Sequence, residues 1–195
     1  MPASSPQTLR PLPRIPHFDA WAPAVQSAEL LRGTLVRCGP GRRLVGWPES
    51  PRVRALALSP WLTDQRIAVR LTAAWIWGAA ASPGHPLRFA MRDGRRATSP
   101  PSPEFTLQQF RMGSGDVVEL DGCMVTSPLR TLFDLLRSQG DADREHRVAC
   151  RLLLARIPDA RALIADRLVN GGRPYRVIAL QRLESCGGTS GPASS

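Results

Sequence analysis

The sequence of 195 residues contains no lysine, and all 26 of its basic residues are arginines. Lysine is the side chain that restriction-like nucleases commonly place beside a group of metal-binding carboxylates. The acidic residues Asp116, Glu119 and Asp121 alternate along one short segment, and spacing identifies no carboxylate partner for them elsewhere. We therefore expect these three side chains to lie on the surface, and we predict no nuclease site.

Cysteine is scarce, and its four positions form no metal-binding pattern. Cys38, Cys123, Cys150 and Cys186 are scattered, without a CxxC pair or a neighbouring histidine at ligand spacing, which argues against a zinc site. We expect four free, reduced thiols. Cys38 lies between arginines that would lower its pKa and make it redox-sensitive, but a free thiol in a hairpin is more often inert.

Recognisable catalytic motifs are also absent. None of the three histidines, His17, His85 and His146, lies beside a serine or cysteine in a nucleophile motif. The pair Gly39 and Gly41 precedes a predicted strand rather than a helix, so it does not form a phosphate-binding loop. We predict no catalytic residue, no metal and no cofactor, and therefore no enzyme.

Long hydrophobic runs are missing as well. The apolar fraction is 43%, yet no run approaches the roughly 20 residues that span a bilayer. Residues 1–16 lack the apolar core and the small-residue cleavage site of a secretory signal. These absences predict a soluble, cytoplasmic protein without a membrane partner.

What the sequence does have is positive charge. The formal net charge is +10, with an isoelectric point near 11.3. A basic excess of this size favours a polyanionic partner, and double-stranded DNA is the leading possibility. The exclusive use of arginine partly reflects codon bias in a GC-rich genome, which reduces the weight of the charge but does not change its sign.

The first third of the chain predicts an extended arm and a winged-helix-like module. Residues 1–16 are rich in proline and serine, which favours an arm that is either disordered or laid along a surface. The module would occupy residues 17–62. It would begin with a helix that is capped by Asp19, ends at Gly33 and carries apolar residues at helical spacing, namely Trp21, Val25, Ala28 and Leu31.

A hairpin and a second helix complete this module. Residues 34–47 contain two short apolar runs around Gly39-Pro40-Gly41, which is typical of a β-hairpin with a tight turn. Ser50 and Pro51 then supply a cap and a first helical residue for a helix to Leu58. A helix followed by an arginine-bearing hairpin has the outline of a winged helix-turn-helix.

Residues 63–185 predict a second domain of the α+β class, followed by a flexible tail at residues 186–195. A short apolar run at residues 67–69 precedes a buried helix at 71–78, and the next part is a small antiparallel β region. Its strands are expected at residues 87–91, 105–112, 116–120 and 123–126. Helices are expected at residues 127–138, 141–156, 158–169 and 174–185.

The segment VTSPLRTLFDLLR, residues 125–137, predicts a joint between the β region and the C-terminal helices. Ser127 can cap the helix, and Pro128 fixes its first φ angle. The apolar stripe consists of Leu129, Leu132, Phe133 and Leu136. Arg130 and Asp134 are four residues apart, so we expect them to pair on the surface.

The same segment carries a resemblance to a known family. Together with residues 72–78 and 87–95, residues 125–135 resemble the "TAAxLxG", "xVHVxxPxGR" and "VTSPxRTLxDLA" patterns of the actinobacterial AbiEi family. These proteins are antitoxins of type IV abortive-infection systems. The resemblance covers roughly residues 30–183. Relatives usually have two or three helices before the wing, whereas this chain has one helix and a proline-rich arm.

The resemblance implies a transcriptional regulator that represses its own operon and counteracts a nucleotidyltransferase-like toxin, typically without forming a stable complex with it. Two alternatives stay open: a protein-interaction module with a degenerate DNA-binding part, in which residues 141–185 bind the partner, and a non-catalytic remnant of a regulator–nuclease fusion. For the regulator, arginines of the first helix end, the wing and the arm would contact phosphates or enter the minor groove. These candidates are Arg32, Arg37, Arg42, Arg43, Arg10 and Arg14.

Overall fold

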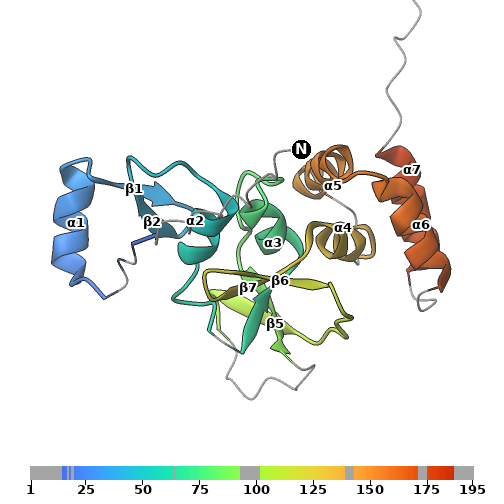
Figure 1. The fold of residues 1–195 in the computed structure, drawn as a ribbon, viewed down its shortest axis with the longest axis horizontal. Coiled ribbons are helices and arrows are strands. Elements are labelled where there is room, and N and C mark those ends of the chain that lie inside the picture. The colour runs from blue at the N-terminus through green and yellow to red at the C-terminus, as the bar shows by residue number, and fades with distance from the viewer. Residues whose placement is uncertain are drawn as a thin grey trace, which may run out of the picture.

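The computed structural model describes residues 15–16, 18, 20–63, 65–92, 102–138, 143–170 and 175–186. These residues form seven helices, a two-stranded sheet and a five-stranded sheet, which confirms the α+β class (Figure 1). Most of the predicted arm and tail, with Arg10, Arg14, His17 and the predicted cap Asp19, lies outside the described residues. None of the helices that the structure describes has the length and apolar composition needed to span a bilayer.

The N-terminal elements follow the predicted order of helix, hairpin and helix. Helix α1 (Pro23–Leu31) packs against the hairpin of β1 (Leu35–Cys38) and β2 (Gly41–Leu44), and α2 (Pro51–Leu56) follows. The Ser50 side chain accepts a hydrogen bond from the Val53 N–H, as the predicted cap requires. Helix α1 begins at Pro23, with Ala22 as its N-cap, and is shorter than predicted.

The apolar side chains that occur at helical spacing in and before α1 are mostly exposed. Trp21, Val25 and Leu31 are exposed, Leu31 to 91%. The one buried residue of the helix is Gln26, at 8% exposure. The apolar spacing predicted a helix correctly, and these side chains stay exposed because α1 lies against a single hairpin (Figure 1).

Two glycines let the hairpin lie close to its neighbours. Gly39 has φ +55°, and a Cβ there would lie 2.7 Å from the Trp75 ring. A Cβ on Gly41 would lie 2.1 Å from the Ala57 carbonyl oxygen, at the end of α2. Gly41 therefore permits a close backbone approach that any larger residue would obstruct.

The five-stranded sheet has the order β5-β4-β3-β7-β6. Pairs β3–β4 and β6–β7 are antiparallel, as expected for this region, and pairs β3–β7 and β4–β5 are parallel. The central strand is β3, which includes most of the short apolar run at residues 67–69. The strands are β3 (Arg66–Ala68), β4 (Leu87–Met91), β5 (Phe105–Gln108), β6 (Val117–Leu120) and β7 (Cys123–Thr126).

Helices cover one side of this sheet and extend away from it (Figure 1). Helix α3 packs on α4, and α4 packs in turn on α5 and α7, while α6 packs on α5 and α7. One cluster of buried side chains runs from α2 through α3 and α4 to α7. The helix bounds are α3 (Arg70–Ile76), α4 (Pro128–Leu136), α5 (Arg144–Arg156), α6 (Ala160–Asn170) and α7 (Arg176–Ser185).

The joint at α4 is confirmed, but its charges are placed differently from the prediction. Ser127 accepts from the Arg130 N–H as the N-cap, and Leu132 and Leu136 are fully buried. Arg130 and Asp134 do pair, with Nε to Oδ2 at 2.9 Å, yet both side chains are buried. Asp116, predicted on the surface, is 3% exposed.

Asp116 is buried because two arginines and a backbone amide satisfy its carboxylate. Arg130 donates to it at 2.6 Å, Arg167 of α6 donates at 2.6 Å, and the Gly113 N–H donates at 2.8 Å. A buried carboxylate without such partners would cost several kcal/mol. Sequence spacing missed this network because Arg167 lies far along the chain from Asp116.

Candidate nucleic-acid interface

The end of α1 presents Arg32 to solvent. Arg32 is the C-cap of α1, and Gly33 with φ +77° ends the helix after it. The Arg32 side chain is 72% exposed and forms an ion pair with Glu29 at 2.7 Å. An exposed pair of this kind contributes little stability, so the guanidinium can exchange Glu29 for another anion.

The hairpin places two arginines opposite one another. Arg37 of β1 pairs in register with Arg42 of β2, and directly opposed residues of an antiparallel pair lie on the same face. Arg37 is exposed and has no hydrogen bond or ion pair within the part of the chain that the structure describes. Arg37 therefore presents its positive charge to solvent on this face.

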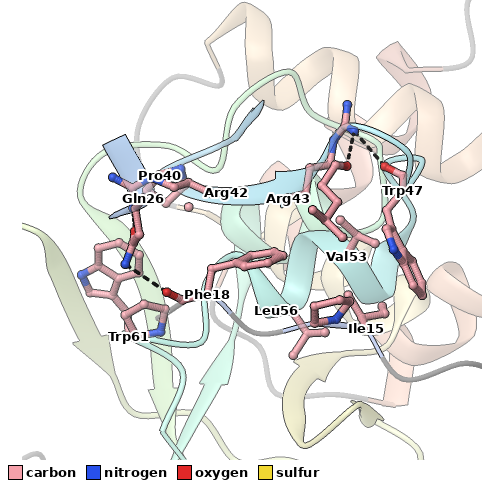
Figure 2. Close-up of a pocket in the computed structure, with 14 residues that line it drawn as sticks. Ile15, Phe18, Gln26, Pro40, Arg42, Arg43, Trp47, Val53, Leu56 and Trp61 are labelled. Atoms are coloured by element: carbon pink, nitrogen blue, oxygen red, sulfur yellow. Dashed lines mark hydrogen bonds between the residues drawn. The ribbon is translucent and has the colours of Figure 1, made fainter. Parts of the chain in front are cut away.

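Arg42 is turned toward α1, where Gln26 acts as a clamp (Figure 2). Arg42 donates to the Gln26 side-chain oxygen. The Gln26 amide nitrogen donates in turn to the carbonyl oxygens of Phe18, at 2.9 Å, and Trp21, at 2.8 Å. The sequence did not reveal Gln26, because a polar residue on a short helix is normally assigned to the solvent side.

Arg43 has a structural role. Its guanidinium donates to the carbonyl oxygens of Leu44, Val45 and Trp47, at 3.1, 3.3 and 2.8 Å, and its Nε lies 3.6 Å from a Glu49 carboxylate oxygen. Only 20% of the side chain is exposed. Of the four described candidates, Arg32 and Arg37 are therefore the freest to meet a partner, while Arg42 and Arg43 hold the hairpin.

The space beneath β2 is a packing seam. Ile15 and Phe18 lie between the hairpin and α2, against Val53 and Leu56 (Figure 2). The remaining cavity measures about 60 Å³, far below the roughly 300–1,000 Å³ of small-molecule sites. Ile15 and Pro16, the two residues of the predicted arm that the structure describes, lie along the hairpin and α2.

Cys38 is shielded from the arginines around it. It is 1% exposed at the end of β1. Burial, together with the Glu49 charge, raises the pKa of the Cys38 thiol to about 11, and the opposing effect of Arg54 and Arg43 is smaller. Cys38 therefore stays protonated at neutral pH, and the structure favours an inert thiol over a redox-sensitive one.

The other two acidic residues lie at the surface, as predicted, and one of them pairs with α2. Asp121 accepts two hydrogen bonds from Arg52 of α2, each at 2.6 Å, while Glu119 is exposed. Among the residues with described positions, no three side chains of His, Cys, Asp or Glu are grouped to hold a metal ion.

Comparisons of this chain with protein-family models, with curated proteins and with solved structures find no match. The resemblance to the AbiEi family therefore stays a prediction.

Proposed function

We propose that this protein is a DNA-binding transcriptional regulator that represses its own operon and acts as an antitoxin against a nucleotidyltransferase-like toxin. The observation that carries the DNA-binding part is the exposed Arg37, placed opposite Arg42 on one face of the β1–β2 hairpin. Arg32 adds a second exposed guanidinium on the same module. The antitoxin part rests on the resemblance of residues 30–183.

The physical basis of binding is the neutralisation of phosphates. Each guanidinium that replaces a condensed counterion contributes to affinity and makes that affinity fall with salt, with a slope of about 0.9 per contact. The net charge of +10 adds long-range attraction. On the hairpin, Arg37 offers the exposed guanidinium, while Arg42 opposite it donates to Gln26.

The test is a titration of the protein against a duplex that carries its own promoter, with a scrambled duplex as competitor, at several salt concentrations. In the variant Arg32→Gln with Arg37→Gln, we expect weaker binding and a salt slope smaller by about two. The matched control is Arg144→Gln with Arg151→Gln, which removes the same charge from exposed positions on α5. Arg43 is unsuitable, because its loss would disturb the hairpin end.

Equal losses in the two double variants would assign the effect to net charge alone and would contradict a hairpin interface. Equal, weak binding of the wild-type protein to both duplexes would instead favour the protein-interaction module. The observation that supports this second candidate is the exposure of apolar side chains on the C-terminal helices. These are Val148, Leu152, Leu163, Val169, Val177 and Ile178.

A further inference from the structure

Helices α5 and α7 bring two cysteines together that are distant in the sequence. Cys150 lies on α5 and is 4% exposed. Cys186 is the C-cap of α7 and is half-buried against the same hydrophobic cluster. Both residues line one cavity, the two thiols interact closely enough to shift each other's pKa, and both cysteines are free.

This pair is accessible from a cavity. The cavity has a volume of about 380 Å³. It is lined by the two cysteines and by Leu135, His146, Arg147, Arg182 and Ser185. A small reagent fits in such a volume without rearrangement of the helices. Although His146 shares the cavity, the described residues contain no group of three side chains placed to hold a metal, so the pair acts as thiols.

The surroundings give the two sulfurs different chemistry. The interaction with Cys150 lowers the pKa of Cys186, Arg151 of α5 and Arg161 of α6 lower it further, and burial opposes them. The same interaction, with burial, raises the pKa of Cys150. Cys186 is thus the thiolate and Cys150 the thiol, an arrangement found in reactive cysteine pairs.

We infer that Cys150 and Cys186 form a modification site for small hydroperoxides, in which Cys186 reacts first and Cys150 converts the product to a disulfide. The Cys186 thiolate attacks one peroxide oxygen, the O–O bond breaks, and the departing hydroxide takes a proton to become water, which leaves a sulfenic acid. The Cys150 sulfur then attacks the sulfenic sulfur. The S–S bond forms, the S–O bond breaks, and hydroxide leaves with the Cys150 proton as a second water.

The disulfide would fix the end of α7 to α5. Arg182 of α7 already donates to the carbonyl oxygens of Leu136 and Ser138, at the end of α4. Oxidation would therefore lock the packing of three helices, and a dithiol reductant would release it. This site is separate from the hairpin and does not depend on the proposed DNA binding.

The test treats the full chain with equimolar hydrogen peroxide, blocks the remaining thiols, and maps peptides without reduction. We expect a loss of about 2 Da, a single disulfide between Cys150 and Cys186, and reversal by dithiothreitol. The Cys186→Ser variant should show no loss of mass. The Cys150→Ser variant should retain a sulfenic acid at Cys186, about 16 Da heavier.

Cys38→Ser is the matched control, since Cys38 is a buried thiol outside the pair, and this variant should form the same disulfide as the wild-type protein. The inference is overturned if the wild-type protein forms no internal disulfide, or if the disulfide includes Cys38 or Cys123. It is equally overturned if Cys186→Ser loses the same mass. Cys186 is only half-buried, so this variant keeps the test sound even where Cys150→Ser does not fold.

Discussion

At the scale of single residues, Asp116 shows how this arginine-rich chain uses its charge inside the fold. Burial acts to raise the pKa of Asp116, but the Gly113 N–H and the guanidinium groups of Arg167 and Arg130 outweigh it, and the pKa is lowered. Its carboxylate joins β6 to α4 and α6. Some of the 26 arginines thus serve stability, and the net charge overstates the surface available to DNA.

Replacing Asp116 with Asn should destabilise the protein by about 3–5 kcal/mol, because Arg130 would lose a buried partner. Urea denaturation measures this change in the free energy of unfolding. Glu119→Gln is the control, since Glu119 is exposed and lies three residues further along the chain. This substitution should change the free energy of unfolding by no more than about 0.5 kcal/mol. Similar values for both variants would refute the buried network.

The same comparison gives a pH dependence. A carboxylate whose folded pKa is lowered contributes stability above its unfolded pKa of about 3.9, and this contribution is lost as pH falls through the folded pKa. Burial raises the pKa of neighbouring Asp134, although Arg130 opposes the shift, so the total pH profile combines opposite trends. The difference in the free energy of unfolding between the wild-type protein and Asp116→Asn isolates the contribution of Asp116. This difference should become smaller below about pH 4.

At the scale of elements, the contact between the hairpin and α2 depends on Gly41. Alanine at this position would place its Cβ 2.1 Å from the Ala57 carbonyl oxygen, and because backbone is on both sides, the hairpin must shift. We expect a cost of about 1–3 kcal/mol and weaker DNA binding if the hairpin is the interface. Gly46→Ala is the control, since a Cβ there meets nothing within 4 Å.

Urea denaturation and the promoter titration measure both effects. If Gly41→Ala and Gly46→Ala were equally stable, the close approach of β2 to Ala57 would be wrong. If Gly41→Ala were less stable but bound the promoter normally, the hairpin would not be the interface.

Local signals predicted the elements well, and non-local contacts explain what they missed. Ser50 and Ser127 cap helices as expected, because a helix cap joins two residues that are only three positions apart in the sequence. The central position of β3 depends on β4 and β7, which pair with it on its two edges and which no local pattern reveals. Likewise the burial of Asp116 follows from tertiary contacts, so the spacing of acidic residues wrongly predicted a surface position for it.

The candidate site shows the same limit of local sequence information. The sequence placed arginines on the hairpin, and Arg37 lies on an exposed face of it. It could not distinguish Arg37 from Arg43, because the carbonyl groups that occupy Arg43 gather only when the hairpin end folds back. Nor could it pair Cys150 with Cys186, which line one cavity although they are distant in the sequence.

At the scale of the whole molecule, the two predicted domains share one core. Val53 and Leu56 of α2 belong to the same buried cluster as Trp75, Leu132 and the side chains of α5 to α7. Arg52 bonds to Asp121, Arg54 donates to the Trp75 carbonyl oxygen at 2.6 Å, and the Cys123 thiol donates to the Ala55 carbonyl oxygen. Helix α2 therefore connects the hairpin that would bind DNA to the C-terminal part of the molecule.

This shared core predicts one cooperative unfolding transition. Three of the five tryptophans, Trp21, Trp47 and Trp61, lie in the module at residues 17–62, so tryptophan fluorescence is weighted toward that module. Circular dichroism at 222 nm is instead dominated by the longer helices α4 to α7. The two signals should give the same urea midpoint. Asp121→Asn, which removes a partly exposed ion pair, should move both midpoints together by a small amount, about 1 kcal/mol or less in free energy. Separate midpoints would mean that the module at residues 17–62 unfolds independently and that the contacts of α2 do not couple it to the rest.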